Sequence, residues 1–322
     1  MELLCTFSNR PGVVEGLKNV KTMNQGKLQV FQVYSPTKQI NYALKVFPRT
    51  EYGATQYQKE KLISKLKHKN IIQRVPAVFH NDEFHFVLTE FAKYGDFFDG
   101  ITQGFLGNNE ILVRTYFHQL IEGLESMHSQ GVAHLDLKLE NIMFGKDFQL
   151  KIIDFDQAQN ISDKEITSGG TLSYRAPEVK DGSCSDLEAA DLFSVGVILY
   201  TFRAQEFPFI EEAEEDFAEF KSYEAYLNDK ASFWKFKANL KNDKNFFSAD
   251  FMKLINGLLE KNPKDRFTIK DIKESKWYNG PILNELRLKS EMQLKWTNFQ
   301  SKKTGSSTCK SPKSPKEEER RN

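Results

Sequence analysis

The chain has 322 residues, of which 39% are hydrophobic. This hydrophobic fraction excludes a wholly disordered protein. The length predicts two lobes or domains, because single cores seldom grow beyond about 300 residues. The formal net charge of +1 gives no reason to expect binding to nucleic acid or to an anionic membrane, and no apolar run reaches the roughly 18 residues of a membrane span. The three cysteines are far apart and form neither a metal-binding pattern nor a disulfide framework. The start of the chain lacks a secretory signal. We therefore expect a cytoplasmic protein, with the nucleus as the alternative.

Strand patterns dominate the first quarter of the chain. Residues 27–35 and 40–47 are rich in β-branched and aromatic side chains and are separated by a turn-like Pro-Thr-Lys-Gln, and residues 85–91 have the same character. Between them, residues 57–68 carry apolar side chains at helical spacing. These side chains are Tyr57, Leu62, Ile63 and Leu66. We therefore predict a small antiparallel sheet with one helix.

Helical patterns follow the last of these strands. Residues 111–128 place their apolar side chains on one stripe, and 190–202 is so apolar that it predicts a buried helix. Two further helices are predicted at 248–259, where Ser248 is the expected N-cap, and at 268–275. The second part of the chain is therefore expected to be larger than the first and mostly helical.

The C-terminal part divides in two. Residues 282–296 predict one amphipathic helix, which either packs on the larger lobe or covers a substrate cleft. From Ser301 onward the chain is rich in Ser, Lys, Pro and Glu without apolar periodicity, so we expect a disordered basic tail. Ser311 and Ser314 each precede Pro-Lys, which fits either a plain linker or a target of a proline-directed kinase.

A short polar segment at residues 134–141, His-Leu-Asp-Leu-Lys-Leu-Glu-Asn, lies between two apolar runs. Phosphoryl transfer requires a carboxylate that orients the attacking hydroxyl, metal ligands that hold the triphosphate, and a lysine that contacts phosphate oxygens. Asp136 fits the first role and Asn141 the second, and Lys138 could neutralise charge on the transferred group. A further acid, Asp154, would complete a site of one Asp and one Asn, which suits Mg²⁺ because this ion keeps waters and phosphate oxygens as its other ligands.

These residues belong to a longer series of motifs that includes Tyr-Ala-Leu-Lys, Asp-Phe-Asp, Ala-Pro-Glu and Asp-x-x-Ser-x-Gly. In this order and spacing the series resembles the eukaryotic protein kinase family, Ser/Thr type, from about Val20 to Tyr278. The motif residues are Lys45, Asp136, Asn141, Asp154, Glu178, Asp191, Ser194 and Gly196, followed by Arg266. By this resemblance, Arg266 pairs with Glu178.

The resemblance implies an α+β fold of two lobes, a bilobal protein-kinase-like fold with a small β-rich N-lobe and a larger α-helical C-lobe. It places an N-terminal extension at 1–17, a kinase domain at 18–279 with lobes of about 18–91 and 92–279, and the C-terminal helix and basic tail at 280–322. It also implies ATP and Mg²⁺ as cofactors and a protein Ser or Thr hydroxyl as the phosphate acceptor. We expect a monomer with no nucleic-acid or membrane partner.

The same resemblance assigns a role to each site residue. Asp136 is the catalytic base, Asn141 and Asp154 hold the metal, and the hydroxyl of Thr171 bridges Asp136 and Lys138. Lys45 binds phosphate and is paired by Glu60, which follows it by 15 residues, somewhat closer than is usual in the family. The remaining nucleotide contacts are Gly26 in the phosphate-covering loop, the gatekeeper Thr89, the backbone of Glu90 to Ala92 at the adenine, and Asp96 near the ribose.

The sequence departs from the family pattern at three further points. The glycine-rich loop keeps only Gly26, although glycines there let backbone N–H groups approach phosphate. Leu135 replaces the arginine that reads an activation-loop phosphate, so phosphorylation of Thr167 or Ser168 should have little effect on activity. Asp156 replaces the glycine of Asp-Phe-Gly and adds negative charge near the metal.

The predicted function is a Ser/Thr protein kinase, and the alternative is a catalytically impaired pseudokinase that acts as a binding scaffold. Asp96 and Glu140 occupy positions where acids contact substrate arginines in the family, which favours basic substrates. The acidic run at residues 211–216 is either a solvated loop or a docking surface for such substrates.

Overall fold

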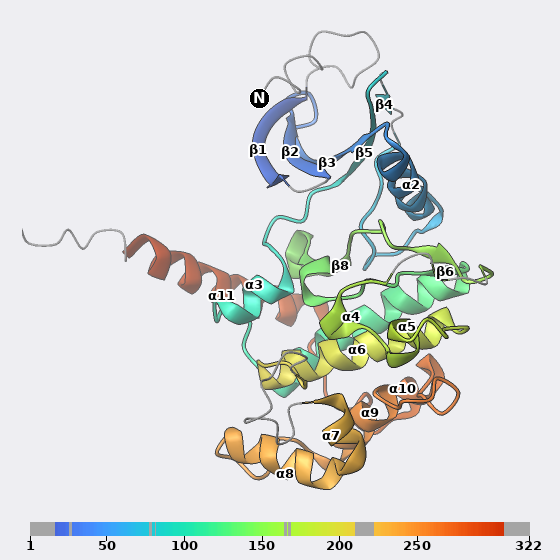
Figure 1. The fold of residues 1–322 in the computed structure, drawn as a ribbon. Coiled ribbons are helices and arrows are strands. Elements are labelled where there is room, and N and C mark those ends of the chain that lie inside the picture. Colours follow the sequence, from blue (N-terminus) through green and yellow to red (C-terminus); the bar gives the residue numbers. More distant parts are fainter. Residues whose placement is uncertain are drawn as a thin grey trace, which may run out of the picture.

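The structure is a computed structural model that describes residues 17–25, 28–76, 79–80, 82–163, 166, 169–209 and 222–305. A small lobe built on one sheet lies above a larger lobe of helices, and the chain passes from the sheet into the large lobe after β5 (Figure 1). This is the predicted α+β arrangement of two lobes, which is confirmed. Gly26, Thr167, Ser168, the acidic run 211–216 and the tail from residue 306 lie outside the described residues.

The sheet of the small lobe has five strands in the order β1-β2-β3-β5-β4, and every neighbouring pair is antiparallel. The strands are β1 (Lys18–Gln25), β2 (Gln29–Ser35), β3 (Ile40–Pro48), β4 (Phe79–His80) and β5 (Phe84–Glu90). The predicted strands at 27–35, 40–47 and 85–91 correspond to β2, β3 and β5.

Alternation along β3 decides which way Lys45 points. Tyr42, Leu44 and Val46 are buried in a cluster on one face of the sheet. Because successive side chains of a strand point to opposite faces, Lys45 and Phe47 point to the other face. There Phe47 is fully buried and its ring lies 5.7 Å from that of Tyr57 in helix α2. The strand pattern therefore directs the lysine towards α2.

The helix of the small lobe differs from the prediction. We predicted a helix at 57–68, but α2 spans Glu51–Glu60, a 3₁₀ helix (η1) covers Lys61–Lys65, and Leu66 is extended. Thr50 starts α2 early by accepting a hydrogen bond from the backbone N–H of Gly53, at 3.2 Å. The apolar spacing of three between Ile63 and Leu66, both buried, suits a 3₁₀ turn and an extended exit better than an α-helix.

The large lobe is built on two long helices, α4 (Glu110–Ser129) and the almost wholly buried α6 (Leu187–Ala204). Its other helices are α3 (Phe97–Thr102), α5 (Pro177–Lys180), α7 (Tyr223–Asn228), α8 (Lys230–Leu240), α9 (Ala249–Leu258), α10 (Ile269–Glu274) and α11 (Glu285–Gly305), with η2 (Leu139–Asn141), η3 (Lys146–Phe148) and η4 (Leu172–Tyr174) as 3₁₀ turns. Short strands β6 (Val132–Ala133) and β9 (Gln159–Asn160) pair with each other, as do β7 (Ile142–Phe144) and β8 (Leu150–Ile152). Ser248 caps α9 by accepting from the N–H of Phe251, as predicted. No helix in the described ranges combines the length and apolar character needed to cross a membrane.

The C-terminal helix α11 packs on the large lobe, beside α3 (Figure 1). Leu288 and Met292 are fully buried in the main core, and the ring of Trp296 lies 5.4 Å from that of Phe105. Of the two predicted positions for this helix, on the larger lobe or over a substrate cleft, these contacts support packing on the larger lobe. The predicted start of disorder at Ser301 is wrong by five residues, because α11 continues to Gly305. The ring of Phe299, which lies 5.5 Å from that of Phe105, anchors this end of the helix.

Candidate active site

The loop between β6 and β7 is held in place by one buried carboxylate. Asp191 in α6 accepts hydrogen bonds from the backbone N–H groups of His134 and Leu135, both at 2.8 Å, and contacts Nε2 of His128 at 2.9 Å. Leu135 has a φ of 61°, a left-handed conformation that is unfavourable for leucine. Two consecutive N–H groups bound to one carboxylate stabilise this turn, so Asp191 has a positioning role rather than a chemical one.

His134 anchors the same loop through both ring nitrogens. Nδ1 accepts a hydrogen bond from the backbone N–H of Asp136 at 3.3 Å, so Nε2 carries the proton and donates to the carbonyl oxygen of Ile153 at 2.9 Å. The ring therefore joins the loop to the segment that carries Asp154. Its position fixes Asp136 and leaves no free ring nitrogen for chemistry.

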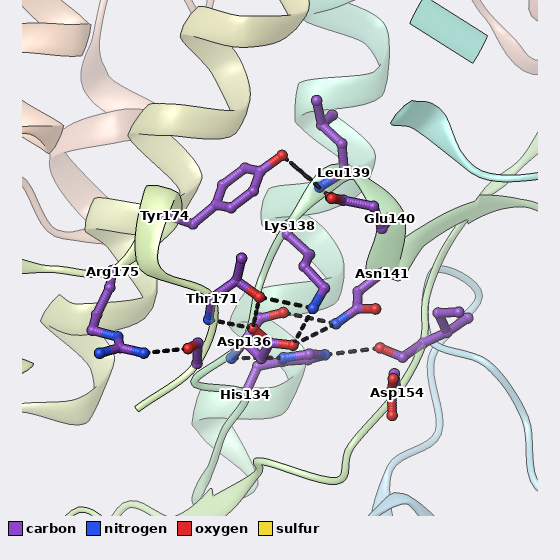
Figure 2. A network of polar contacts seen from close by, with 12 residues as sticks. His134, Asp136, Lys138, Leu139, Glu140, Asn141, Asp154, Thr171, Tyr174 and Arg175 are labelled. Carbon is purple, nitrogen blue, oxygen red and sulfur yellow. Dashed lines mark hydrogen bonds and ion pairs between the residues drawn. The ribbon is translucent and has the colours of Figure 1, made fainter. Parts of the chain in front are cut away.

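Asp136, Lys138 and Thr171 form a closed triangle of hydrogen bonds (Figure 2). Lys138 Nζ donates to Asp136 Oδ2 at 2.7 Å and to Thr171 Oγ1 at 2.8 Å. The hydroxyl and the backbone N–H of Thr171 both donate to Asp136 Oδ1 at 2.7 Å. Asp136 is buried, so these contacts compensate the loss of water around its charge. A substrate hydroxyl bound here would meet an oriented carboxylate beside a cation.

Asn141 is oriented by Asp136. Its side-chain amide nitrogen donates to the backbone oxygen of Asp136 at 2.9 Å and to Oδ2 at 3.1 Å. Its amide oxygen has no hydrogen bond to another described residue and is left as an acceptor. The backbone N–H of Ile153 donates to the backbone oxygen of Asn141 at 2.9 Å, which brings the segment that leads to Asp154 alongside (Figure 2).

Lys45 joins the two lobes. Its Nζ lies 3.0 Å from Oε2 of Glu60 and also donates to Oδ1 of Asp154, and the same Glu60 oxygen accepts from the backbone N–H of Phe155 at 3.2 Å. Burial alone would lower the pKa of Lys45, but the charges of Glu60 and Asp154 outweigh burial and raise that pKa well above its ordinary value. The lysine is therefore a permanent cation that couples β3, α2 and the Asp-Phe-Asp segment.

The acids at this centre fit a divalent cation. Burial would raise the pKa of Asp154, yet the charge and hydrogen bond of Lys45 outweigh burial and lower that pKa, so the carboxylate is ionised. The ionised Asp154 and the free amide oxygen of Asn141 are the kind of oxygen ligands that Mg²⁺ accepts. Within the described ranges, no group of three or more His, Cys, Asp and Glu side chains could hold a metal ion unaided. This donor set fits an ion that is also held by substrate phosphates.

The connection after β5 supplies the groups expected to meet the nucleotide base. Thr89 lies in β5 opposite Ala43 of β3. The Glu90 side chain faces another way, since it accepts from Lys151 Nζ at 2.6 Å and from the backbone N–H of Gln73 at 2.9 Å. Ala92 is buried, and its backbone N–H makes no hydrogen bond to another described residue. A buried N–H without a partner is costly, so an acceptor atom of a ligand would be stabilising here.

Asp96 has a structural contact in addition to its expected place near the ribose. Its side chain caps α3 by accepting from the backbone N–H of Asp99 at 2.7 Å. Burial, and then the charges of Asp99 and Glu140, raise the pKa of Asp96 above its ordinary value despite this hydrogen bond. The negative charges of Asp96 and Glu140 therefore repel each other, and a bound cation would relieve that repulsion.

Asp156 makes the site sensitive to pH. Burial, and then the charge of Asp154, raise the pKa of Asp156 above its ordinary value. The folded protein therefore binds this proton more tightly than the unfolded chain, and the ionised side chain destabilises the fold at every pH above the raised pKa.

We expect Asp156→Asn to raise the melting temperature by about 2 °C or more near neutral pH. The gain should shrink as the pH falls towards 3.8, the ordinary value for this carboxyl group, because wild-type Asp156 is then neutral as well. Differential scanning fluorimetry of both proteins across this pH range measures the difference. The exposed Asp82→Asn is the matched control, and a gain that is independent of pH would contradict the assignment.

Tyr174 belongs to the site, although no role was predicted for it from the sequence. Its hydroxyl donates to Glu140 at 3.3 Å, and its backbone oxygen accepts from the Ser194 hydroxyl at 2.8 Å. The segment that carries Thr171 is thus tied both to the catalytic loop and to α6. Downstream, Arg266 makes a two-pronged ion pair with Glu178 at 2.6 and 2.9 Å, as the resemblance implied. The only signal for Tyr174 in the sequence was its place two residues before Ala176, where the Ala-Pro-Glu motif begins.

Two lobes are joined through a lysine–carboxylate pair, with a positioned carboxylate at their junction, as the resemblance implied. The protein kinase domain family matches residues 18–278. The chain belongs to the protein kinase family, which confirms the predicted family. It is similar to CBL-interacting protein kinase 26 of Oryza sativa subsp. japonica, with 33% identity over 243 residues that cover 73% of this chain and 46% of that protein. It is also similar to CBL-interacting serine/threonine-protein kinase 12 of Arabidopsis thaliana, with 30% identity over 223 residues that cover 67% of this chain and 42% of that protein. The chain therefore spans less than half the length of these relatives.

Proposed function

We propose that this chain transfers the γ-phosphoryl group of ATP to a Ser or Thr hydroxyl of a protein, with Mg²⁺ as the metal. The observation that carries this proposal is the triangle of Asp136, Lys138 and Thr171, which presents a buried carboxylate and a cation side by side. The lysine in this triangle would neutralise charge on the transferred group, and the carboxylate would orient the hydroxyl that attacks it.

In this mechanism each residue acts from the position it already occupies. Lys45, held by Glu60, binds phosphate oxygens of ATP and fixes the triphosphate against the small lobe. Asp154 and Asn141 would hold Mg²⁺, which supplies positive charge to the phosphate oxygens when bound. Asp136 orients the substrate hydroxyl and accepts its proton as the oxygen bonds to the γ-phosphorus and the bond to ADP breaks.

The test combines binding and transfer. We expect ATP to raise the melting temperature of the purified chain only when Mg²⁺ is present, and labelled phosphate to pass from γ-labelled ATP to Ser and Thr peptides but not to a matched Tyr peptide. The alternative scaffold function rests on the loss of glycines around Gly26 and on the charge of Asp156. It would be favoured by the absence of both the Mg²⁺-dependent shift and the transfer.

We further propose that the enzyme favours basic substrates. Support comes from the raised pKa of Asp96, to which the charge of Glu140 contributes, and from the partial exposure of both side chains. A substrate arginine would form charge-assisted hydrogen bonds with these carboxylates.

We expect Glu140→Gln to raise KM about threefold to tenfold for a Ser peptide with upstream arginines, which corresponds to about 0.7–1.4 kcal/mol, the net contribution of one hydrogen bond. The KM for the same peptide with alanines in place of the arginines should not change. Steady-state kinetics with both peptides provides the comparison, and an equal change for the two peptides would count against basic recognition. Asp96 is not a suitable target because it also caps α3.

The remaining expectations stay proposals. We propose a monomer in a reducing compartment, the cytoplasm or the nucleus, whose activity does not depend on phosphorylation of Thr167 or Ser168 because Leu135 cannot pair with phosphate. The relatives are named for interaction with CBL. The match covers less than half of each relative, so it supports the phosphotransfer reaction more strongly than that interaction.

A further inference from the structure

A groove of about 820 Å³ lies between α8 and α9 on the large lobe. These helices are at the end of the large lobe farthest from the sheet, so the groove is remote from Lys45 and the junction of the lobes (Figure 1). None of the residues assigned to phosphoryl transfer lines it. The groove therefore requires an explanation other than the active site.

The two walls carry matching stripes of side chains. On α8 the four residues Ala231, Trp234, Lys235 and Ala238 line the groove, with Lys230 and Asn239 beside them, and on α9 the four residues Ala249, Met252, Lys253 and Asn256 line it. Both sets follow the spacing i, i+3, i+4, i+7, which places each on one helical face. Each face offers one large apolar side chain and one lysine, and the small side chains of Ala231, Ala238 and Ala249 leave room for a third helix to pack against both.

The floor is apolar and preformed. Trp234 and Phe247 are 6% and 4% exposed, and the Trp234 indole N–H donates to Asn256 Oδ1 at 3.0 Å. The ring of Phe247 lies 5.1 Å from that of Trp234 and 5.7 Å from that of Phe251. Because these rings are held by one another, apolar side chains of a ligand could enter without reorganisation of the floor.

The rim is positively charged. Lys230, Lys235, Lys244 and Lys253 line the groove, and none of its lining residues, all within the described part of the chain, is acidic. Lys230 pairs with Glu260 at 2.9 Å. The other three make no ion pair with another described residue, and all three are exposed. Four lysines around an apolar floor are complementary to an acidic segment that carries apolar anchors.

We propose that the groove between α8 and α9 is a docking site for an acidic amphipathic helix of a partner protein. The apolar side chains of that helix would pack on Trp234, Met252 and Phe247, and its carboxylates would pair with Lys235, Lys244 and Lys253. The proposal does not depend on phosphoryl transfer. If the partner is also a substrate, docking would raise the local concentration of its acceptor hydroxyl at the remote active site.

The test uses a fluorescein-labelled helical peptide of about four turns with Leu on one face and Glu on the other. We expect saturable binding to the full chain by fluorescence anisotropy, weakened several-fold between about 50 mM and about 500 mM NaCl. The triple variant Lys235→Glu, Lys244→Glu, Lys253→Glu should weaken binding at least about tenfold. The matched control Lys38→Glu, Lys264→Glu, Lys276→Glu makes the same change in net charge at exposed lysines elsewhere and should change it less than about twofold.

Two altered peptides test the two halves of the proposal. Replacing Leu by Ala should abolish saturable binding, and so should replacing Glu by Lys. The proposal would be overturned if the lysine-bearing peptide bound as well as the acidic one, or if both triple variants weakened binding equally. It would also be overturned if the groove were covered by a second copy of this chain, seen as self-association in sedimentation velocity that only the groove variant removes. Melting temperatures of both variants and their phosphotransfer rates verify that the fold and the active site are intact.

Discussion

Replacing Asp136 by asparagine is expected to lower the rate of phosphoryl transfer by about 10²- to 10⁴-fold, the range for loss of a positioned general base. Asparagine has nearly the same shape and its oxygen can still accept from Thr171. It has no negative charge for Lys138 and cannot take the proton of the substrate hydroxyl. Asp136 makes no contact with Lys45 or Asp154 in the described hydrogen bonds, and its backbone oxygen still accepts from the amide of the proposed metal ligand Asn141. The Mg²⁺-dependent shift produced by ATP should therefore persist.

Transfer of labelled phosphate and thermal shift measured on the same preparation separate these effects. The matched control is Asp147→Asn, which removes a surface acid that pairs with Lys289 at 2.9 Å and keeps a residue type that tolerates its φ of 56°. The control should transfer phosphate at the wild-type rate. Transfer by the Asp136 variant at a rate similar to that of the control would mean that another group activates the hydroxyl.

Replacing Lys45 by methionine should both abolish phosphate transfer and cost about 3 kcal/mol of stability, the lower end of the range for a broken buried ion pair. The cost arises because Glu60, 4% exposed, and Asp154, 32% exposed, lose the cation between them. The partial exposure of Asp154 is the reason for choosing the lower end. Urea unfolding followed by tryptophan fluorescence measures this loss.

The double variant Lys45→Met, Glu60→Gln separates stability from chemistry. Removing the charge of Glu60 should recover part of the lost stability, because the buried glutamate is no longer an unpaired charge. Phosphate transfer should remain absent, since no cation is restored for the phosphates. A double variant less stable than Lys45→Met would contradict the account of Glu60 as a counter-charge.

The parts of the site that lie close together in the chain were the most predictable. Asp136, Lys138 and Asn141 fall within six residues, and a short loop has little freedom to separate them. The link from Lys45 to Asp154 spans 109 positions, and only the resemblance to a family connected these residues before the structure did. Spacing alone carries no information about contacts at that distance.

The errors in the prediction have identifiable physical causes. The start of α2 depends on the side chain of Thr50, an N-cap signal that a search for apolar spacing does not weigh. The extension of α11 to Gly305 depends on Trp296 and Phe299 packing on Phe105, which is distant in the sequence. The groove between α8 and α9 forms only because the folded chain places two stripes of side chains next to each other. The sequence pattern of either helix alone therefore did not indicate a binding surface.

The central claim is that Asp136, Asn141, Asp154 and Lys45 converge on a single metal-bound nucleotide. It is tested most directly by a crystal structure with Mn²⁺ and a non-hydrolysable ATP analogue, in which anomalous scattering locates the metal. The account predicts a metal about 2.2 Å from oxygens of Asp154 and Asn141, a phosphate oxygen in contact with Lys45, and the γ-phosphate facing Asp136. A metal peak away from these residues, or a nucleotide that leaves Lys45 paired only with Glu60 and Asp154, would contradict it.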